Sequence, residues 1–212
     1  MKKRAQRNRK KTRIIAILRG VEREHLAPVA DALYEGGVTV MEVTLNTPGA
    51  VSMIAGLQES HGEKMYIGAG TVLDVDQAKE AIAAGAAYLV TPNMEEEVIR
   101  YAVEQGVPIF PGAFTPTEIV KAWKAGAAAV KLFPCASVGL PYIKDVIAPL
   151  NHIPLIAVGG ITEDNLLQYL DAGCYALGIG GSLINLKEIR QGNYGWVKEK
   201  ASRLSALSTS RV

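Results

Sequence analysis

The feature that most constrains the fold is a regular alternation of short apolar segments with longer amphipathic ones. Eight apolar runs of strand length, the first at residues 14–18, are separated by stretches with helical periodicity. Several helical stretches end in small-residue caps, and Gly85, Gly106 and Gly126 follow one another at intervals of 21 and then 20 residues. Glycine readily adopts the left-handed conformation that ends a helix. Each interval therefore corresponds to one compact αβ unit.

The pattern predicts strands and helices in strict alternation. The expected strands are residues 14–18, 38–45, 65–69, 88–90, 108–110, 128–133, 154–158 and 176–179. The expected helices are residues 22–34, 48–58, 74–84, 95–105, 116–125, 141–150 and 163–172, with Pro48 in the first turn of the second one and a last helix within residues 193–212 that covers the barrel base.

These strands are apolar nearly throughout, which is typical of parallel strands covered on both faces. A (β/α)8 barrel and an open doubly wound sheet both fit such a pattern. Eight units in about 190 residues, with no GxGxxG motif after the first strand, favour a single (β/α)8 TIM barrel over residues 14–212.

Charge is distributed unevenly along the chain. Eight of the 23 basic side chains lie within residues 1–13, which hold no acid, so 15 basic residues face 21 acidic ones in the rest of the chain. We expect residues 1–13 to form a disordered basic leader. Contact of this leader with RNA or phosphate is the alternative, but a nucleic-acid-binding protein normally carries basic residues across its body as well.

Other classes of protein fit the composition less well. No apolar run approaches the roughly 18 residues of a membrane span, and no apolar region of a signal peptide follows the leader. Cys135 and Cys174 are too few for a disulfide framework, and no cluster of Cys and His has metal-ligand spacing. The sequence therefore predicts a cytoplasmic protein with no metal site and no nucleic-acid or membrane partner. We expect His25, His61 and His152 to lie at the surface, and Cys135 to be a small buried thiol.

The ends of the strands carry the chemistry of a barrel, because active sites of TIM barrels form at the carboxyl ends of the strands. The charged groups expected at this mouth are Arg19, Glu42 and Lys131. Lys131 lies inside the apolar run 129–134, where burying an ammonium group without a partner is costly. Glu42 shares one strand face with Val40 and would approach Lys131 across the lumen.

Two explanations of this pair remain open. The first is a buried salt bridge that fills one layer of the barrel. The second is an amine nucleophile with an acid/base partner, because burial lowers the pKa of a lysine until part of it is neutral near pH 7.

Two glycine clusters point to a phosphate. One contains Gly159 and Gly160 after the seventh strand, and the other contains Gly181 and Ser182 after the eighth. Backbone amides in these two loops, beside helix N-termini, are the usual phosphate site of a TIM barrel.

Taken together, these motifs resemble the KDPG/KHG aldolases, the class I aldolases of 2-keto-3-deoxy-6-phosphogluconate (KDPG) and 4-hydroxy-2-oxoglutarate (KHG). The similarity spans residues 14–186, and its motifs lie at residues 41–45, 67–72, 91–92, 111–118, 130–134, 159–161 and 180–182.

The resemblance implies cleavage of KDPG to pyruvate and glyceraldehyde 3-phosphate, with KHG as a second substrate that gives pyruvate and glyoxylate. It implies that Lys131 forms the Schiff base, that Glu42 is the general acid/base, and that no cofactor is needed. It also implies a homotrimer. The implied substrate-binding residues are Arg19, Asn46, Thr71, Thr91, Pro92 and Phe133, and the implied phosphate-binding residues are Gly159, Gly160, Gly181 and Ser182.

Two positions depart from the family pattern. Asn46 stands where many members have a carboxylate-binding arginine, and Val158 stands where many have threonine. The segment Leu45–Asn46 also resembles the branch that acts on the galactonate epimer, which is an alternative substrate. The remaining alternatives are a phosphate-binding barrel without covalent chemistry, such as an isomerase or a synthase, a sugar-phosphate sensor, and an assembly scaffold.

Overall fold

The computed structural model describes residues 13–210. Of the predicted basic leader, only Arg13 falls within this range, so the expectation of disorder lies outside the described residues. Arg13 donates a hydrogen bond from Nε to the carbonyl oxygen of Tyr175 at 2.8 Å and another from Nη2 to that of Cys174. This basic residue therefore belongs to the folded body.

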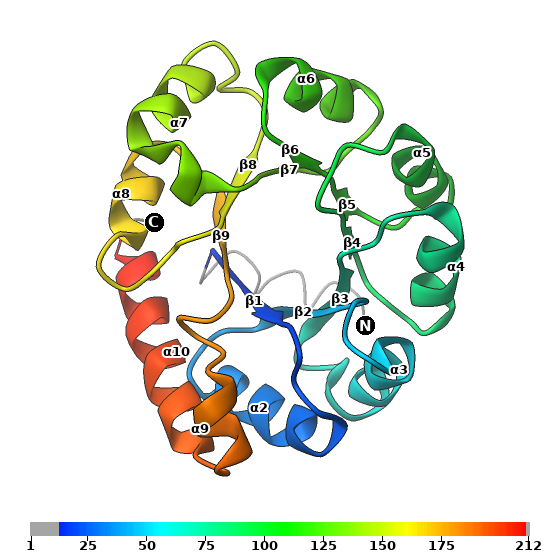
Figure 1. The fold of residues 1–212 in the computed structure, drawn as a ribbon, viewed down its shortest axis with the longest axis vertical. Helices are drawn as coiled ribbons and strands as arrows, with labels where there is room; N and C mark the ends of the chain where they lie inside the picture. The colour runs from blue at the N-terminus through cyan, green and yellow to red at the C-terminus, as the bar shows by residue number, and fades with distance from the viewer. Residues whose placement is uncertain (1–12, 211–212) are drawn as a thin grey trace.

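The core of the fold is a closed parallel sheet, seen end-on in Figure 1. Its strands are β1 (Ile14–Leu18), β2 (Val40–Thr44), β3 (Tyr66–Gly70), β4 (Leu89–Val90), β5 (Ile109–Phe110), β6 (Gly112–Ala113), β7 (Val130–Leu132), β8 (Leu155–Val158) and β9 (Ala176–Ile179). Their order in the sheet is β5-β4-β3-β2-β1-β9-β8-β7-β6, and every neighbouring pair is parallel. All strands therefore end at one common mouth.

Pro111 divides the fifth barrel strand into β5 and β6. β5 pairs with β4 on one side, and β6 pairs with β7 on the other. Proline has no N–H to donate, but the Pro111 carbonyl still accepts a hydrogen bond from the Lys131 amide at 2.9 Å. Since β5 and β6 are one residue apart, they close the ring, and the eight predicted barrel strands are confirmed with the fifth one split.

Helices form an outer ring around the barrel (Figure 1). They are α2 (Arg23–Glu35), α3 (Ala50–His61), α4 (Val75–Ala83), α5 (Glu96–Glu104), α6 (Pro116–Lys124), α7 (Gly139–Ile147), α8 (Leu166–Asp171), α9 (Leu186–Arg190) and α10 (Tyr194–Thr209), with a 3₁₀ turn, η1, at Cys135–Ser137. None of these helices is long and apolar enough to cross a membrane. The predicted caps Gly85, Gly106 and Gly126 have φ values of 90°, 67° and 104°, as expected of helix-ending glycines.

Two apolar clusters stabilise the barrel. The larger cluster lies between the sheet and the helices, and a smaller one fills the lumen. In the lumen, the Tyr88 ring stacks on Tyr66 with centroids 4.8 Å apart and contacts Phe110 at a tilt with centroids 5.2 Å apart. The lumen is therefore filled by side chains and forms a packed core.

Some expectations about the helices were wrong. α10 packs in the outer ring against α2 and α8 and does not cover the barrel base (Figure 1). Pro48 lies in the turn before α3, because the left-handed Gly49 (φ 78°) intervenes before the helix begins.

The expected surface position of His61 was also wrong. His61 ends α3 with only 4% of its surface exposed, and its Nε2 lies 3.1 Å from an Asp31 carboxylate oxygen. That contact gives the buried imidazole a polar partner, which an apolar environment would not provide.

Candidate active site

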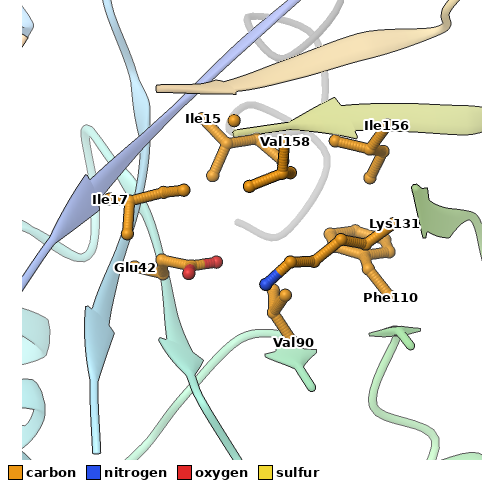
Figure 2. A pocket seen from close by; sticks show the side chains of 9 residues that line it. Ile15, Ile17, Glu42, Val90, Phe110, Lys131, Ile156 and Val158 are labelled. Atoms are coloured by element: carbon orange, nitrogen blue, oxygen red, sulfur yellow. The ribbon is translucent and has the colours of Figure 1, made fainter. Parts of the chain in front are cut away.

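Lys131 projects from β7 into the lumen, and only 5% of its surface is exposed. Its neighbours in the sheet are Gly112 of β6 and Ile156 of β8. The side chain lies against Phe110, and its Nζ points toward β2 on the opposite side of the lumen (Figure 2). The strand geometry thus delivers a buried amine to the centre of the barrel.

Glu42 projects into the same space from β2 and is 2% exposed. Its carboxylate lies above β3, where a β-carbon added to Gly70 would come within 2.3 Å of Oε1. A β-carbon on Gly68 would instead come within 2.5 Å of the Tyr88 ring. The two glycines of β3 therefore leave room for two different side chains, the aromatic ring and the carboxylate.

A small cavity separates the amine from the carboxylate. It measures about 10 Å³, about the space for one water molecule, and its walls are mostly aliphatic. Its lining residues are Ile15, Ile17, Glu42, Val90, Phe110, Lys131, Ile156, Val158 and Gly178. Figure 2 shows the Glu42 carboxylate and Lys131 Nζ facing one another across it.

Burial shifts the pKa values of Lys131 and Glu42 in the directions that favour the neutral form of each group. Desolvation lowers the pKa of Lys131 below 10.5, and the nearby Arg19 charge lowers it further, although Glu42 acts in the opposite direction. Desolvation raises the pKa of Glu42 above 4.5, against the attraction of Lys131 and Arg19. The two groups affect each other as charges through space rather than through a side-chain hydrogen bond. Because the cavity lies between them, the Lys131 amine and the Glu42 carboxylate lack the direct contact that is expected of a structural salt bridge.

Arg19 and Phe133 flank this pair. Arg19 follows the end of β1 with an exposed side chain and acts on both buried groups as a charge. Phe133 follows β7, and its ring centroid lies 4.8 Å from Lys131 Nζ. Both predicted residues therefore lie beside the amine and the carboxylate, one as a charge and one as an apolar surface.

The other predicted substrate residues differ in position. Thr91, after β4, is fully buried and accepts a hydrogen bond from the Gly112 amide at 3.2 Å, so its hydroxyl joins adjacent strands. Pro92 follows it, half-buried. Thr71 follows β3 in a left-handed conformation (φ 58°), which is unusual for a β-branched residue and typical of functional sites. Asn46 is exposed in the β2–α3 turn, in a groove beside α4 rather than in the lumen cavity.

The two glycine loops lie side by side at the ends of β8 and β9. Val158 pairs with Gly178, and Ser182 Oγ donates a hydrogen bond to the Ile161 carbonyl at 2.6 Å. Gly159 and Gly160 have left-handed φ values of 106° and 71°, and a β-carbon on Gly181 would meet no atom within 4 Å. The four predicted residues therefore lie on two neighbouring loops, with Gly160 and Gly181 exposed and Gly159 and Ser182 half-buried.

The expected helix N-termini do not adjoin these loops. α8 begins only at Leu166 and α9 only at Leu186, because each glycine cluster is followed by several residues of turn. Any anion bound here would therefore be held by the amides of the loops themselves rather than by a helix end.

Sequence reasoning missed several residues that shape the site. Gly70 was considered only as part of the motif at residues 67–72. A glycine inside a strand often marks a place where another group approaches the backbone closely, and here that group is the Glu42 side chain of the neighbouring strand. Asn165, whose side chain contacts the β8–α8 loop, was not noted at all. Phe110 was assigned only to a strand, although it lies against Lys131 (Figure 2).

Comparisons with known proteins give a consistent result. A family model described as KDPG and KHG aldolase matches residues 6–200. A 2-dehydro-3-deoxy-6-phosphogalactonate aldolase of Escherichia coli K12 is 41% identical over 171 residues, which cover 80% of this chain and 83% of that protein.

Solved structures agree with this. One described as a native KDPGal structure has a TM-score of 0.88 at 36% identity, covering 93% of this chain and 95% of that one. A KDPG aldolase from Legionella pneumophila, with pyruvate captured as a covalent carbinolamine intermediate, has a TM-score of 0.83 at 27% identity, covering 96% and 95%.

Proposed function

Because this chain belongs to the KDPG and KHG aldolase family and is an aldolase, we propose that it cleaves a 6-phosphorylated 2-keto-3-deoxy aldonate through a Schiff base on Lys131. The products are pyruvate and glyceraldehyde 3-phosphate. The observation that carries the proposal is the buried Lys131 amine, with a lowered pKa, facing Glu42 across a cavity.

The reaction begins at the amine. Neutral Lys131 Nζ attacks the C2 ketone of the substrate to form a carbinolamine, which loses water to give the iminium. Removal of the proton from the C4 hydroxyl then breaks the C3–C4 bond, whose electron pair moves into the iminium. The aldehyde leaves, the resulting enamine is protonated at C3, and water hydrolyses the iminium to release pyruvate and the free lysine.

Glu42 moves the protons in this sequence. Burial raises the pKa of Glu42 toward neutral pH, and an acid/base catalyst is most effective when its pKa is close to the working pH. The cavity beside it has room for about one water molecule, which would carry protons between the carboxyl group and the substrate. Phe133 covers one side of the amine and excludes bulk water. Arg19 and Thr71 hold the carboxylate of the keto acid, and Pro92 lines its approach.

The phosphate binds at the other end of the substrate. The proposed ligands are the backbone amides of Gly159, Gly160, Gly181 and Ser182, which require no side-chain charge. Their support is the adjacency of the two loops and the open space beside Gly181.

For the sugar, we propose the galactonate epimer as the better substrate. The E. coli relative at 41% identity is named for the phosphogalactonate compound. Val158 lines the cavity of Lys131 and Glu42, so an apolar side chain replaces a hydroxyl near the reacting carbons. Asn46 is the second position at which the chain resembles that branch. The gluconate epimer is the competing candidate.

The Schiff base is tested by reduction with borohydride in the presence of pyruvate. We expect the intact mass to increase by one reduced pyruvate adduct per chain and peptide mapping to place it on Lys131. Lys131→Arg, which keeps the charge but not the nucleophile, is the matched control and should show no adduct. An adduct on another lysine, or none in the unaltered protein, would refute the covalent mechanism.

The choice of epimer is tested by measuring kcat/KM for both 6-phosphorylated compounds, with pyruvate release as the signal. A higher value for the galactonate compound is expected. Val158→Thr should then shift the ratio toward the gluconate compound, because it restores a hydroxyl near C4. A higher kcat/KM for the gluconate compound in the unaltered enzyme would reverse our assignment while leaving the Schiff base intact.

We also propose that the enzyme works as a homotrimer. The exposed apolar side chains of Leu73 and Phe114, 49% and 37% exposed, lie in loops at the mouth of the barrel and are candidates for coverage by a neighbouring subunit. Sedimentation equilibrium should give three times the monomer mass, and a monomer mass would contradict the proposal.

A further inference from the structure

Asn165 occupies the position just before α8, where an asparagine usually caps the helix. Here its side chain makes no capping hydrogen bond to α8. It reaches back instead: Oδ1 accepts a hydrogen bond from the Thr162 amide at 2.8 Å, and Nδ2 donates one to the Gly160 carbonyl at 2.8 Å. The side chain therefore caps no N–H group of α8 itself, and its bond to the Thr162 amide closes the turn before the helix, where the Leu166 amide donates to the Thr162 carbonyl at 3.0 Å.

The two hydrogen bonds fix the conformation of the β8–α8 loop from Gly160 to Thr162. In a trans peptide the C=O and the following N–H point in opposite directions. Since the Gly160 carbonyl is directed at Asn165, the Ile161 N–H is directed away from it. The Ile161 carbonyl is itself held by Ser182 Oγ at 2.6 Å. Three successive residues thus have backbone groups held by two side chains.

The loop is also confined on the side of Lys131. A β-carbon on Gly160 would lie 2.6 Å from Cβ of Ala136, and one on Gly159 would lie 3.3 Å from the amide nitrogen of Cys135. Both contacts belong to η1, the segment that follows the strand of Lys131. The position of this loop therefore determines how far a phosphate bound on it lies from the amine.

We propose that Asn165 is a positioning residue for the phosphate end of the substrate. It holds the backbone of Gly160, Ile161 and Thr162 in the shape in which the loop amides face the phosphate. The proposal rests on the proposed function, because it concerns the same site. Loss of Asn165 releases the loop, so the enzyme loses affinity for the phosphate while the chemistry at Lys131 continues.

The experiment compares two aldehydes in the condensation direction. Pyruvate is combined either with glyceraldehyde 3-phosphate or with unphosphorylated glyceraldehyde, and the preference is the ratio of the two kcat/KM values. For Asn165→Ala we expect KM for glyceraldehyde 3-phosphate to rise about tenfold, the effect of losing about 1.4 kcal/mol of binding. The kinetic constants for glyceraldehyde should stay within about twofold of the unaltered enzyme, and the inhibition constant of inorganic phosphate should rise together with KM.

Asn193→Ala is the matched control. Asn193 also precedes a helix without capping it, and its side chain donates to Glu188 rather than to the loop. This variant should keep the full preference for the phosphorylated aldehyde. If Asn165→Ala keeps that preference as well, or if it slows both aldehydes equally, Asn165 does not position the phosphate loop.

Asn165→Asp keeps the inference testable should Asn165→Ala fold poorly. The carboxylate still accepts from the Thr162 amide but cannot donate to the Gly160 carbonyl. Its negative charge also repels phosphate, and that effect is screened at high salt. A loss of preference that persists at high salt supports the inference, and one that disappears there contradicts it.

The same assay separates this inference from the proposed phosphate site. If the unaltered enzyme shows no preference for glyceraldehyde 3-phosphate, the phosphate site itself is wrong. If that preference is present and survives Asn165→Ala, the phosphate site stands and only the role of Asn165 is refuted.

Discussion

The carboxylate of Glu42 lies in the space that a side chain at position 70 would need. A β-carbon on Gly70 would come within 2.3 Å of Glu42 Oε1 and 2.7 Å of Cδ. In the sheet, Glu42 is level with Gly68, so its side chain leans two residues along β3 toward the mouth. The orientation of the proposed acid/base therefore depends on the absence of a side chain on the next strand.

Gly70→Ala should displace the Glu42 carboxylate and reduce kcat on the order of 100-fold, because misplacement of a catalytic group by about 1 Å costs that much. Exchange of the pyruvate methyl protons with D2O, followed by NMR, should slow by a similar factor. The same substitution should also be made in the Glu42→Gln variant. There Gly70→Ala should reduce kcat little further, because the carboxylate that it displaces is already absent.

Gly56→Ala is the control for this prediction. It adds the same methyl group in α3, where a β-carbon meets no atom within 4 Å. This variant should be as active as the unaltered enzyme and slightly more stable, by about 0.5–1 kcal/mol, because alanine suits a helix interior better than glycine. Equal activity of Gly70→Ala and Gly56→Ala would show that Glu42 does not need this space.

Lys131→Met should abolish cleavage and raise the thermal unfolding midpoint. The folded protein lowers the pKa of Lys131, so between that pKa and 10.5 the unfolded chain binds more protons and stability rises with pH. The cost of the buried ammonium is fully present below the folded-state pKa. The increase in stability of Lys131→Met should therefore be largest at neutral and acidic pH and become smaller as the pH approaches 10.5. Each kcal/mol of added stability should raise the unfolding midpoint by about 2–4 °C. A lower midpoint for Lys131→Met at pH 7 would show that Lys131 stabilises the fold.

Arg19→Gln should move the pH dependence of Schiff-base formation to higher pH. The Arg19 charge lowers the pKa of Lys131, so its removal raises that pKa and leaves less neutral amine at a given pH. The measurement is the rate of borohydride-trapped adduct formation with saturating pyruvate as a function of pH. Arg23→Gln, an exposed arginine on α2 that donates to Ser52, serves as the control and should leave the profile in place. If the rate of adduct formation rises over the same pH range in Arg19→Gln as in the unaltered enzyme, the Arg19 charge does not affect the pKa of Lys131.

The two cysteines should resist alkylation in the folded protein. Burial raises the pKa of Cys135 to about 11 and that of Cys174 to about 12. At pH 8 only about one Cys135 side chain in a thousand is then the reactive thiolate. Intact mass after iodoacetamide should show far slower labelling of the native chain than of the chain in guanidinium chloride. Rapid labelling of the native chain would mean that the barrel opens around Cys135.

Much of the fold follows from local patterns. Apolar runs of strand length separated by helical periodicity predicted the eight strands and the barrel, and the glycine spacing marked the helix ends at Gly85, Gly106 and Gly126. The predicted starts of the helices were less accurate, because the turn after each strand can extend into the segment where apolar periodicity already begins. At Pro48 the left-handed Gly49 delays α3, and after the glycine loops the turns delay α8 and α9.

The site was predictable to the extent that chemistry appears as an unusual residue in a regular pattern. A lysine and a glutamate inside apolar strands cost free energy, so each required an explanation. Asn165 gave no such signal, because an asparagine before a helix is ordinary. His61 was misassigned for a similar reason: its buried contact with Asp31 joins two helices and leaves no mark on the local sequence.

The sequence by itself determined that Lys131 and Glu42 lie inside a parallel barrel and that two glycine loops follow its last strands, since periodicity and residue type act locally. Only the tertiary structure decided how these parts meet. The cavity that separates the amine from the carboxylate, the clearance above Gly70 and the hydrogen bonds of Asn165 to the β8–α8 loop depend on strand register and on side chains from different elements. Such distances arise from the packing of the whole barrel, and no single segment specifies them.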